Sequence, residues 1–164
     1  MTLLLHLYAR QQLMMNTIAS PIFMQLPVAL QNDKLNVLVV DDALIMREHI
    51  VELLVETGLV GIIGLANDVR SALEAITEAE PQVVILDIGL PGTLEQHNGI
   101  DVLRWIKQTR PHVHVVMLTN LSDRAYREAA RRLGAYAFLD KSREFDQLPD
   151  IVKALSGLVA SQPN

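Results

Sequence analysis

From residue 35 onward, short apolar runs alternate with longer segments of helical period. Five nearly continuous apolar runs lie at 36–40, 59–66, 82–86, 113–118 and 135–139. Helical segments follow them at 43–57, after 67–68, from 98–99 to 109, from 122–123 to 133 and over 144–158. Continuous rather than alternating apolar runs are typical of strands buried on both faces, as in a parallel sheet covered by helices. The pattern predicts a three-layer, doubly wound α/β sandwich of five βα units.

Glycine and proline residues mark where several of these segments end. Gly58 and Gly134 directly follow two helical segments, and Pro81 ends a third. The second apolar run contains Gly61 and Gly64, which favour an edge strand over a central one.

Residues 1–34 differ from the rest in composition and pattern, with few charges, two prolines and no clear strand period. The apolar run 3–8 is too short to span a bilayer and lacks the basic residues that precede a signal-peptide core, so we expect neither export nor a membrane span. A helix over 3–15 with an apolar stripe is one alternative. The favoured interpretation is a loosely ordered extension or a start codon placed too early, with Met14, Met15 or Met24 as the other possible starts. One domain follows at 35–158, with a short tail at 159–164.

Composition narrows the class of protein. The 164 residues are 50% hydrophobic and 20% charged, which is typical of a globular domain. The formal net charge of −5 argues against direct DNA binding. Cysteine is absent, which excludes disulfides and thiolate metal sites and agrees with a cytoplasmic location.

Four of the five apolar runs end on residues that can do chemistry. Asp41 and Asp42 follow the first run, Asp87 the third and Thr119 the fourth, and Lys141 lies two residues after the fifth. The carboxyl ends of parallel strands lie on one edge of a sheet, where open α/β sheets bind their ligands. We therefore expect these residues, far apart in the sequence, to converge on one site.

Three carboxylates in one pocket repel each other unless a cation lies among them. Read alone, Asp41 and Asp42 would be explained as an acidic turn or helix cap, but Asp87 and Lys141 favour a site. An oxygen-only donor set suits a hard ion, Mg²⁺ or Mn²⁺. With such an ion and Lys141 to neutralise charge, a carboxylate can attack phosphorus in line and form an acyl phosphate, and Thr119 could hydrogen-bond the new phosphoryl oxygens.

With these motifs in place, residues 35–158 resemble the receiver domain of two-component response regulators, which has the flavodoxin-like fold of the chemotaxis regulator. The resemblance implies a five-stranded parallel sheet in the order 2-1-3-4-5. It implies that Asp87 is the phospho-acceptor and that Asp41 and Asp42 are the acidic pair that binds Mg²⁺ together with Asp87. It also implies that the carbonyl of Gly89 completes the metal shell.

The resemblance assigns three further residues to the response. Thr119 is the switch hydroxyl, Lys141 pairs with the phosphoryl group, and Phe138 lies where the family has its switch aromatic. Core packing explains Phe138 equally well.

The sequence also departs from the family pattern. The glycine that opens the third helix usually lies eight residues after the acceptor, whereas Gly99 lies twelve residues after Asp87. The longer loop is either a contact surface or a tolerated insertion. Asn120 replaces a usual alanine or glycine, and Ser142 replaces the usual proline after the lysine. The phosphorylation rate is therefore left open.

The functional hypothesis is a stand-alone response regulator. A histidine kinase or phosphotransfer protein would phosphorylate Asp87, and an unknown downstream protein would contact the fourth helix, fifth strand and fifth helix; a homodimer is left open. The main alternative is a hydrolase with a phosphoaspartate intermediate, but such enzymes usually have a second aspartate where this chain has Gly89. A receiver-like interaction module without phosphorylation is a third alternative.

Three arginines in the fourth helical segment recur at helical spacing. Arg124, Arg127 and Arg131 fall on one face at i, i+3 and i+7. The face is either solvated or recognises an acidic partner, and solvation is the favoured interpretation.

Overall fold

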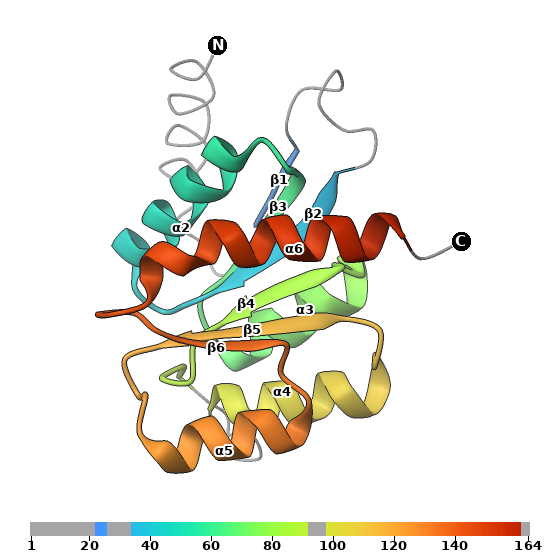
Figure 1. The fold of residues 1–164 in the computed structure, drawn as a ribbon. Helices are drawn as coiled ribbons and strands as arrows, with labels where there is room; N and C mark the ends of the chain where they lie inside the picture. The colour runs from blue at the N-terminus through green and yellow to red at the C-terminus, as the bar shows by residue number, and fades with distance from the viewer. Residues whose placement is uncertain (1–21, 26–33, 92–97, 162–164) are drawn as a thin grey trace.

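The computed structural model describes residues 22–25, 34–91 and 98–161, and these form one sheet between two layers of helices (Figure 1). The strands are β1 (Ile22–Gln25), β2 (Leu35–Val40), β3 (Val60–Ala66), β4 (Val83–Leu86), β5 (His114–Thr119) and β6 (Ala137–Asp140). The helices are α2 (Leu44–Thr57), α3 (Val69–Ala79), α4 (Gly99–Thr109), α5 (Arg124–Leu133), α6 (Leu148–Ala160) and the short 3₁₀ helix η2 (Phe145–Gln147).

Five of the strands are parallel and adopt the predicted order. The sheet reads β3-β2-β4-β5-β6 across its parallel part, which is the order 2-1-3-4-5 counted from residue 35. Helices α2 and α6 cover one face, and α3, α4 and α5 cover the other (Figure 1). The prediction of a doubly wound α/β sandwich is confirmed.

A sixth strand lies inside the region predicted as an extension. Strand β1 pairs antiparallel with β3, and Phe23 lies opposite Gly64. A Cβ atom on Gly64 would lie 2.8 Å from Cε1 of Phe23, so the glycine leaves room for the ring to lie over β3. Strand β3 is therefore an edge only among the parallel strands. The sequence did not predict β1 because four residues are too few to show a period.

The core consists of two clusters, one on each face of the sheet. Along β2 the side chains alternate between them: Val37 and Val39 pack towards α2 and α6, whereas Leu38 and Val40 pack towards α3 and α4. All four side chains are at most 1% exposed. Burial on both faces explains why the strands read as continuous apolar runs.

Most helix ends lie where the sequence placed them, with one correction. Asp68 caps α3 through the amide of Ser71, and Gly58 ends α2 in the left-handed conformation. The predicted last helix at 144–158 is instead η2 followed by α6, which begins at Leu148. Pro149 lacks a backbone N–H and so is favoured in the first turn of a helix, which accounts for the later start.

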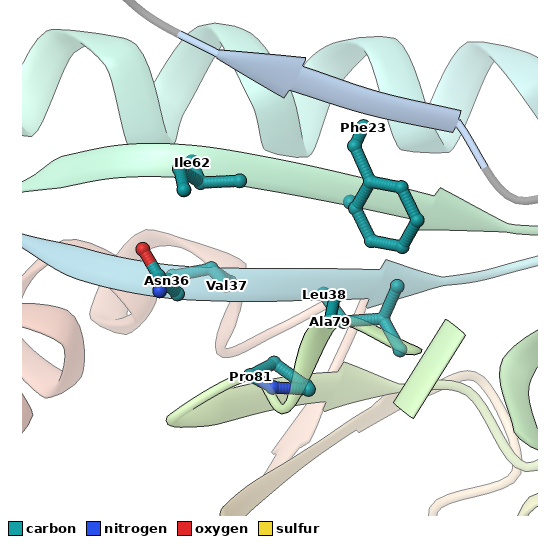
Figure 2. Close-up of a pocket in the computed structure, with 8 residues that line it drawn as sticks. Phe23, Asn36, Val37, Leu38, Ile62, Ala79 and Pro81 are labelled. Carbon is teal, nitrogen blue, oxygen red and sulfur yellow. The ribbon is translucent and has the colours of Figure 1, made fainter. Parts of the chain in front are cut away.

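An apolar pocket of about 250 Å³ lies beside β1, between the sheet and the end of α3 (Figure 2). Phe23, Leu38 and Pro81 line it, and Asn36 contributes a polar side chain. Asn36 and Pro81 lie at the amino ends of the central strands, so the pocket is at the opposite end of the sheet from Asp41.

Among the described residues, no helix has the length and apolar character needed to cross a membrane.

Candidate functional site

Adjacent strands bring the three predicted aspartates together. Asp41 and Asp42 follow β2, and Asp87 follows β4, whose last residue lies opposite the last residue of β2. The amide of Asp87 donates a hydrogen bond to the carbonyl of Val40 at 2.9 Å, which extends the ladder to the acidic residues. One carboxylate oxygen from each aspartate lies within 4.8 Å of the others. A cluster of this size can share one cation.

The three carboxylates differ in burial and in hydrogen bonding. Asp41 is 1% exposed and Asp87 is 7% exposed, whereas Asp42 is exposed. Oδ1 of Asp41 accepts from the amide of Ala43 at 3.0 Å, and Oδ1 of Asp87 accepts from the amide of Gly89 at 3.1 Å. In both buried residues one oxygen is therefore used by the local turn and the other, Oδ2, is left for the site.

Lys141 lies between the two buried carboxylates. Its Nζ is 2.5 Å from Oδ2 of Asp41 and 2.5 Å from Oδ2 of Asp87, and the lysine side chain is only 6% exposed. Burial alone would lower the pKa of Lys141, but hydrogen bonds and charges from the two aspartates outweigh it and raise that pKa. The lysine is therefore held in its charged form.

The positive charge of Lys141 does not neutralise the negative charge of the three aspartates. Burial raises the pKa of Asp41 despite the hydrogen bond and charge of Lys141, and the charge of Asp87 adds to the rise. With Asp42 included, three carboxylates face one ammonium group. The oxygen donors and their excess negative charge fit Mg²⁺, which would be held by Asp41, Asp42 and Asp87.

The other predicted site residues lie at different distances from this cluster. Thr119 is fully buried at the end of β5, and its Oγ1 accepts from the amide of Leu121 at 3.1 Å. Gly89 lies at the exposed rim, two residues after Asp87. Phe138, on β6, is partly buried and packs against the core cluster on the α5 side of the sheet. The roles assigned to these residues stay predictions.

Gly99 fixes the backbone beside Asp87, a constraint that the sequence alone did not show. A Cβ atom on Gly99 would overlap the carbonyl oxygen of Asp87 and lie 2.9 Å from Cα of Ile88. The carbonyl of Ile88 accepts hydrogen bonds from both Leu90, at 2.9 Å, and Gly99, at 3.0 Å. The predicted longer loop lies mostly at 92–97, outside the described residues, but these bonds hold both of its ends beside Asp87.

The sequence did not predict two further sets of contacts, which side chains make with the backbone or with other side chains near the site. Arg47 donates to the backbone carbonyl of Asp41 from helix α2. Asp140, directly before Lys141, accepts from the hydroxyl of Ser122 and, at 2.7 Å, from the amide of Ser142. No repeat or motif in the sequence indicates either set.

The fold and the acidic site define a class: a doubly wound domain with three aspartates and a lysine at the carboxyl edge of its sheet. The family model of the response regulator receiver domain matches residues 37–153, and the chain belongs to that family. Receiver domains interact with histidine kinases or phosphotransfer proteins, and they typically bind Mg²⁺ at an acidic pocket.

Individual relatives agree with this assignment. The chain is 30% identical over 120 residues to the Fimbriae Z protein of Salmonella typhimurium, covering 73% of this chain and 55% of that protein. It is 38% identical over 125 residues to a protein-glutamate methylesterase/protein-glutamine glutaminase of Rhizobium etli, covering 72% of this chain and 35% of the enzyme. The response regulator domain of CheB from Thermotoga maritima superposes with a TM-score of 0.66 at 27% identity, covering 79% of this chain and 99% of that one.

The similarity is confined to one part of the larger relatives. The chain spans about half of the Fimbriae Z protein and about a third of the methylesterase. What those proteins do beyond their receiver domains therefore does not transfer to this chain.

Proposed function

We propose that the protein is a stand-alone response regulator that accepts a phosphoryl group on Asp87 and signals through contact with another protein. The observation that carries the proposal is the position of Lys141, whose ammonium group is 2.5 Å from both Asp41 and Asp87. It supports an acceptor carboxylate with a fixed cation at hand to meet incoming negative charge.

The proposed reaction is in-line transfer from a phosphohistidine. Oδ2 of Asp87 attacks the phosphorus, the P–N bond breaks, and the imidazole of the donor leaves with the bonding electron pair. Bound Mg²⁺, held by the three aspartates and the carbonyl of Gly89, would supply positive charge to the phosphoryl oxygens. Lys141 and the hydroxyl of Thr119 would hold the product by ionic and hydrogen-bonding contacts.

The output in this proposal is a change of surface at α5, β6 and α6. The phosphoryl group biases an existing equilibrium between two conformations, with Thr119 and Phe138 moving as the state changes. A downstream partner that prefers one state then detects the signal, or a second phosphotransfer protein accepts the group in a relay.

The proposal that the regulator acts alone is tested by the size of the protein in its native cell. An immunoblot band clearly larger than expected for 164 residues would contradict it.

The acceptor assignment is tested with purified protein, Mg²⁺ and acetyl phosphate as donor. Intact mass should show one added phosphoryl group that is lost under alkaline conditions or with hydroxylamine. Asp87→Asn should show no addition, while the matched control Asp146→Asn, an exposed position on η2, should be labelled like the wild type. Equal labelling of Asp87→Asn and wild type would disprove the assignment, and chelation of Mg²⁺ should abolish labelling.

The same experiment separates a phospho-acceptor from a hydrolase. A hydrolase would release inorganic phosphate steadily from many small phosphoesters, whereas the acceptor forms about one acyl phosphate per chain. Gly89 has no side chain with which to act as an acid or base, which favours the acceptor. An unphosphorylated interaction module would show neither product.

A further inference from the structure

Helix α5 is joined to strand β6 through one arginine. Nη1 of Arg127 donates to the carbonyl of Phe138 at 3.1 Å, and Nη2 donates to Oε2 of Glu144 at 2.6 Å. The guanidinium carbon lies 4.8 Å from the centre of the Phe138 ring, a cation–π distance. Arg127 thus contacts both the backbone and the ring of Phe138, and the expectation of a solvated arginine face is wrong for this residue.

Arg124, three residues earlier on the same helix, is placed differently. The side chain of Arg124 is 92% exposed and pairs with Glu128 on the same helix, whereas the side chains of Arg127 and Glu144 are 38% and 30% exposed. A half-buried arginine that donates to two acceptors is worth more than an exposed ion pair because water screens it less. Arg124 therefore provides a matched control on the same helix.

Glu144 continues the connection towards the candidate site. The oxygen that accepts from Arg127 also accepts from the backbone amide of Asp140 at 2.8 Å. Asp140 directly precedes Lys141, whose ammonium group contacts Asp87. One carboxylate oxygen therefore links a side chain of helix α5 to the segment that carries the lysine of the site.

The end of β6 and the residue after it are held on their other side as well. The carboxylate of Asp140 accepts from Ser122, which lies between β5 and α5, and the amide of Lys141 donates to the carbonyl of Thr119 at 3.0 Å. Because the segment is fixed at several points, a displacement of the backbone at Lys141 has to move these anchors or break them. Glu144 is the anchor that connects directly to helix α5.

We propose that Arg127 and Glu144 form the link through which a change at Asp87 reaches helix α5, with Arg127 as the positioning residue for Phe138. The inference rests on the proposed phosphorylation of Asp87. A phosphoryl group there requires Lys141 to follow it away from Asp41. The displaced segment carries Glu144 with it, and Arg127 then changes its contact with Phe138 and reorients α5.

The test uses beryllofluoride with Mg²⁺ as a stable mimic of the phosphoryl group and amide hydrogen exchange as the readout. In the wild type, beryllofluoride should change exchange both near Asp87 and along α5. Arg127→Met and Glu144→Gln should keep the change near Asp87 and reduce the change along α5 at least threefold. The controls Arg124→Met and Glu128→Gln should respond like the wild type.

The double variant distinguishes a link from a general loss of structure. If the two residues act as one unit, the combination of Arg127→Met and Glu144→Gln should lose no more of the α5 response than either single variant. Glu144→Gln keeps a hydrogen-bond acceptor in place, so it remains a valid test if Arg127→Met fails to fold.

The inference and the proposed function fail in different ways. If the wild type does not take up beryllofluoride, the proposed function fails and the link fails with it. If beryllofluoride binds but α5 does not respond in the wild type, or if both variants respond like the wild type, only the link is overturned. Loss of the response in Arg124→Met would also overturn it, because any change of charge on α5 would then suffice.

Discussion

Replacing Lys141 with methionine should destabilise the protein in the absence of divalent cations, because it leaves two buried carboxylates facing each other. In the wild type, Nζ lies 2.5 Å from an oxygen of Asp41 and of Asp87, and these residues are 1% and 7% exposed. Methionine preserves much of the length and apolar volume of the lysine stem but removes the charge. Breaking a buried ion pair on one side typically costs about 3–5 kcal/mol.

The free energy of unfolding that Lys141→Met loses has an upper bound, and this bound depends on pH. The variant can relieve the repulsion by protonating one aspartate, which at pH 7 costs about 1.4 kcal/mol for each unit above an ordinary pKa near 3.9, or roughly 4 kcal/mol in total. At pH 5 the same protonation costs only about 1.5 kcal/mol. A carboxyl whose pKa is raised in the folded state weakens the fold as pH rises above the unfolded pKa, so the penalty of Lys141→Met should grow from pH 5 to pH 7.

Urea unfolding followed by circular dichroism, at both pH values and with or without Mg²⁺, measures these changes. Mg²⁺ at a hundred times its dissociation constant should add about 3 kcal/mol to the free energy of unfolding. At the same Mg²⁺ concentration the gain should be larger in Lys141→Met, which should bind the ion more tightly because no ammonium group competes for the carboxylates. Lys153→Met, at an exposed position on α6, is the control. A penalty that is equal at both pH values, or below about 1 kcal/mol at pH 7, would refute the reasoning.

Three other predictions concern stability. Gly99→Ala should cost about 3 kcal/mol or more in urea unfolding, because its Cβ overlaps the carbonyl of Asp87, whereas the control Gly157→Ala, which has open space inside a helix, should gain up to about 1 kcal/mol. Asp68→Ala removes the cap of α3 and should cost about 1 kcal/mol by the same assay; no loss would contradict the capping role. Burial lowers the pKa of His114, so the unfolded chain takes up a proton at a higher pH than the folded protein does. The melting temperature should therefore fall as pH drops through about 6.5, and it should fall less steeply in His114→Gln. If the melting temperatures of wild type and variant fall equally with pH, this cause is excluded.

The parts of the site that depend on strand order could be predicted from the sequence. Asp41, Asp42 and Asp87 follow buried runs, and parallel pairing requires the ends of such runs to meet at one edge. Lys141 follows the same rule, although its position between two carboxylates needed the structure. The cap of α3 was also predictable, because Asp68 and the amide that it binds are only three residues apart in the sequence.

What escaped prediction depends on long side chains or on short, irregular backbone. Arg127 and Glu144 are seventeen residues apart, and nothing in either segment indicates that they pair. Strand β1 has only four residues, and its place beside β3 depends on the missing side chain of Gly64, which the sequence suggested only as a sign of an edge. The sequence predicted Gly99 only as the start of a helix. In the structure, the carbonyl of Asp87 lies so close to Gly99 that it leaves no space for a side chain there.

The shared carbonyl of Ile88 makes the neighbouring loop a suitable place to insert foreign sequence. Leu90 and Gly99 both donate to that carbonyl, so the chain leaves and returns at one fixed point, whatever lies between. Closing a flexible loop of twice the length costs only about 0.6 kcal/mol more. A reporter peptide or small fluorescent tag placed between Pro91 and Asn98 would therefore sit at the rim of the acidic site without altering the backbone of Asp87.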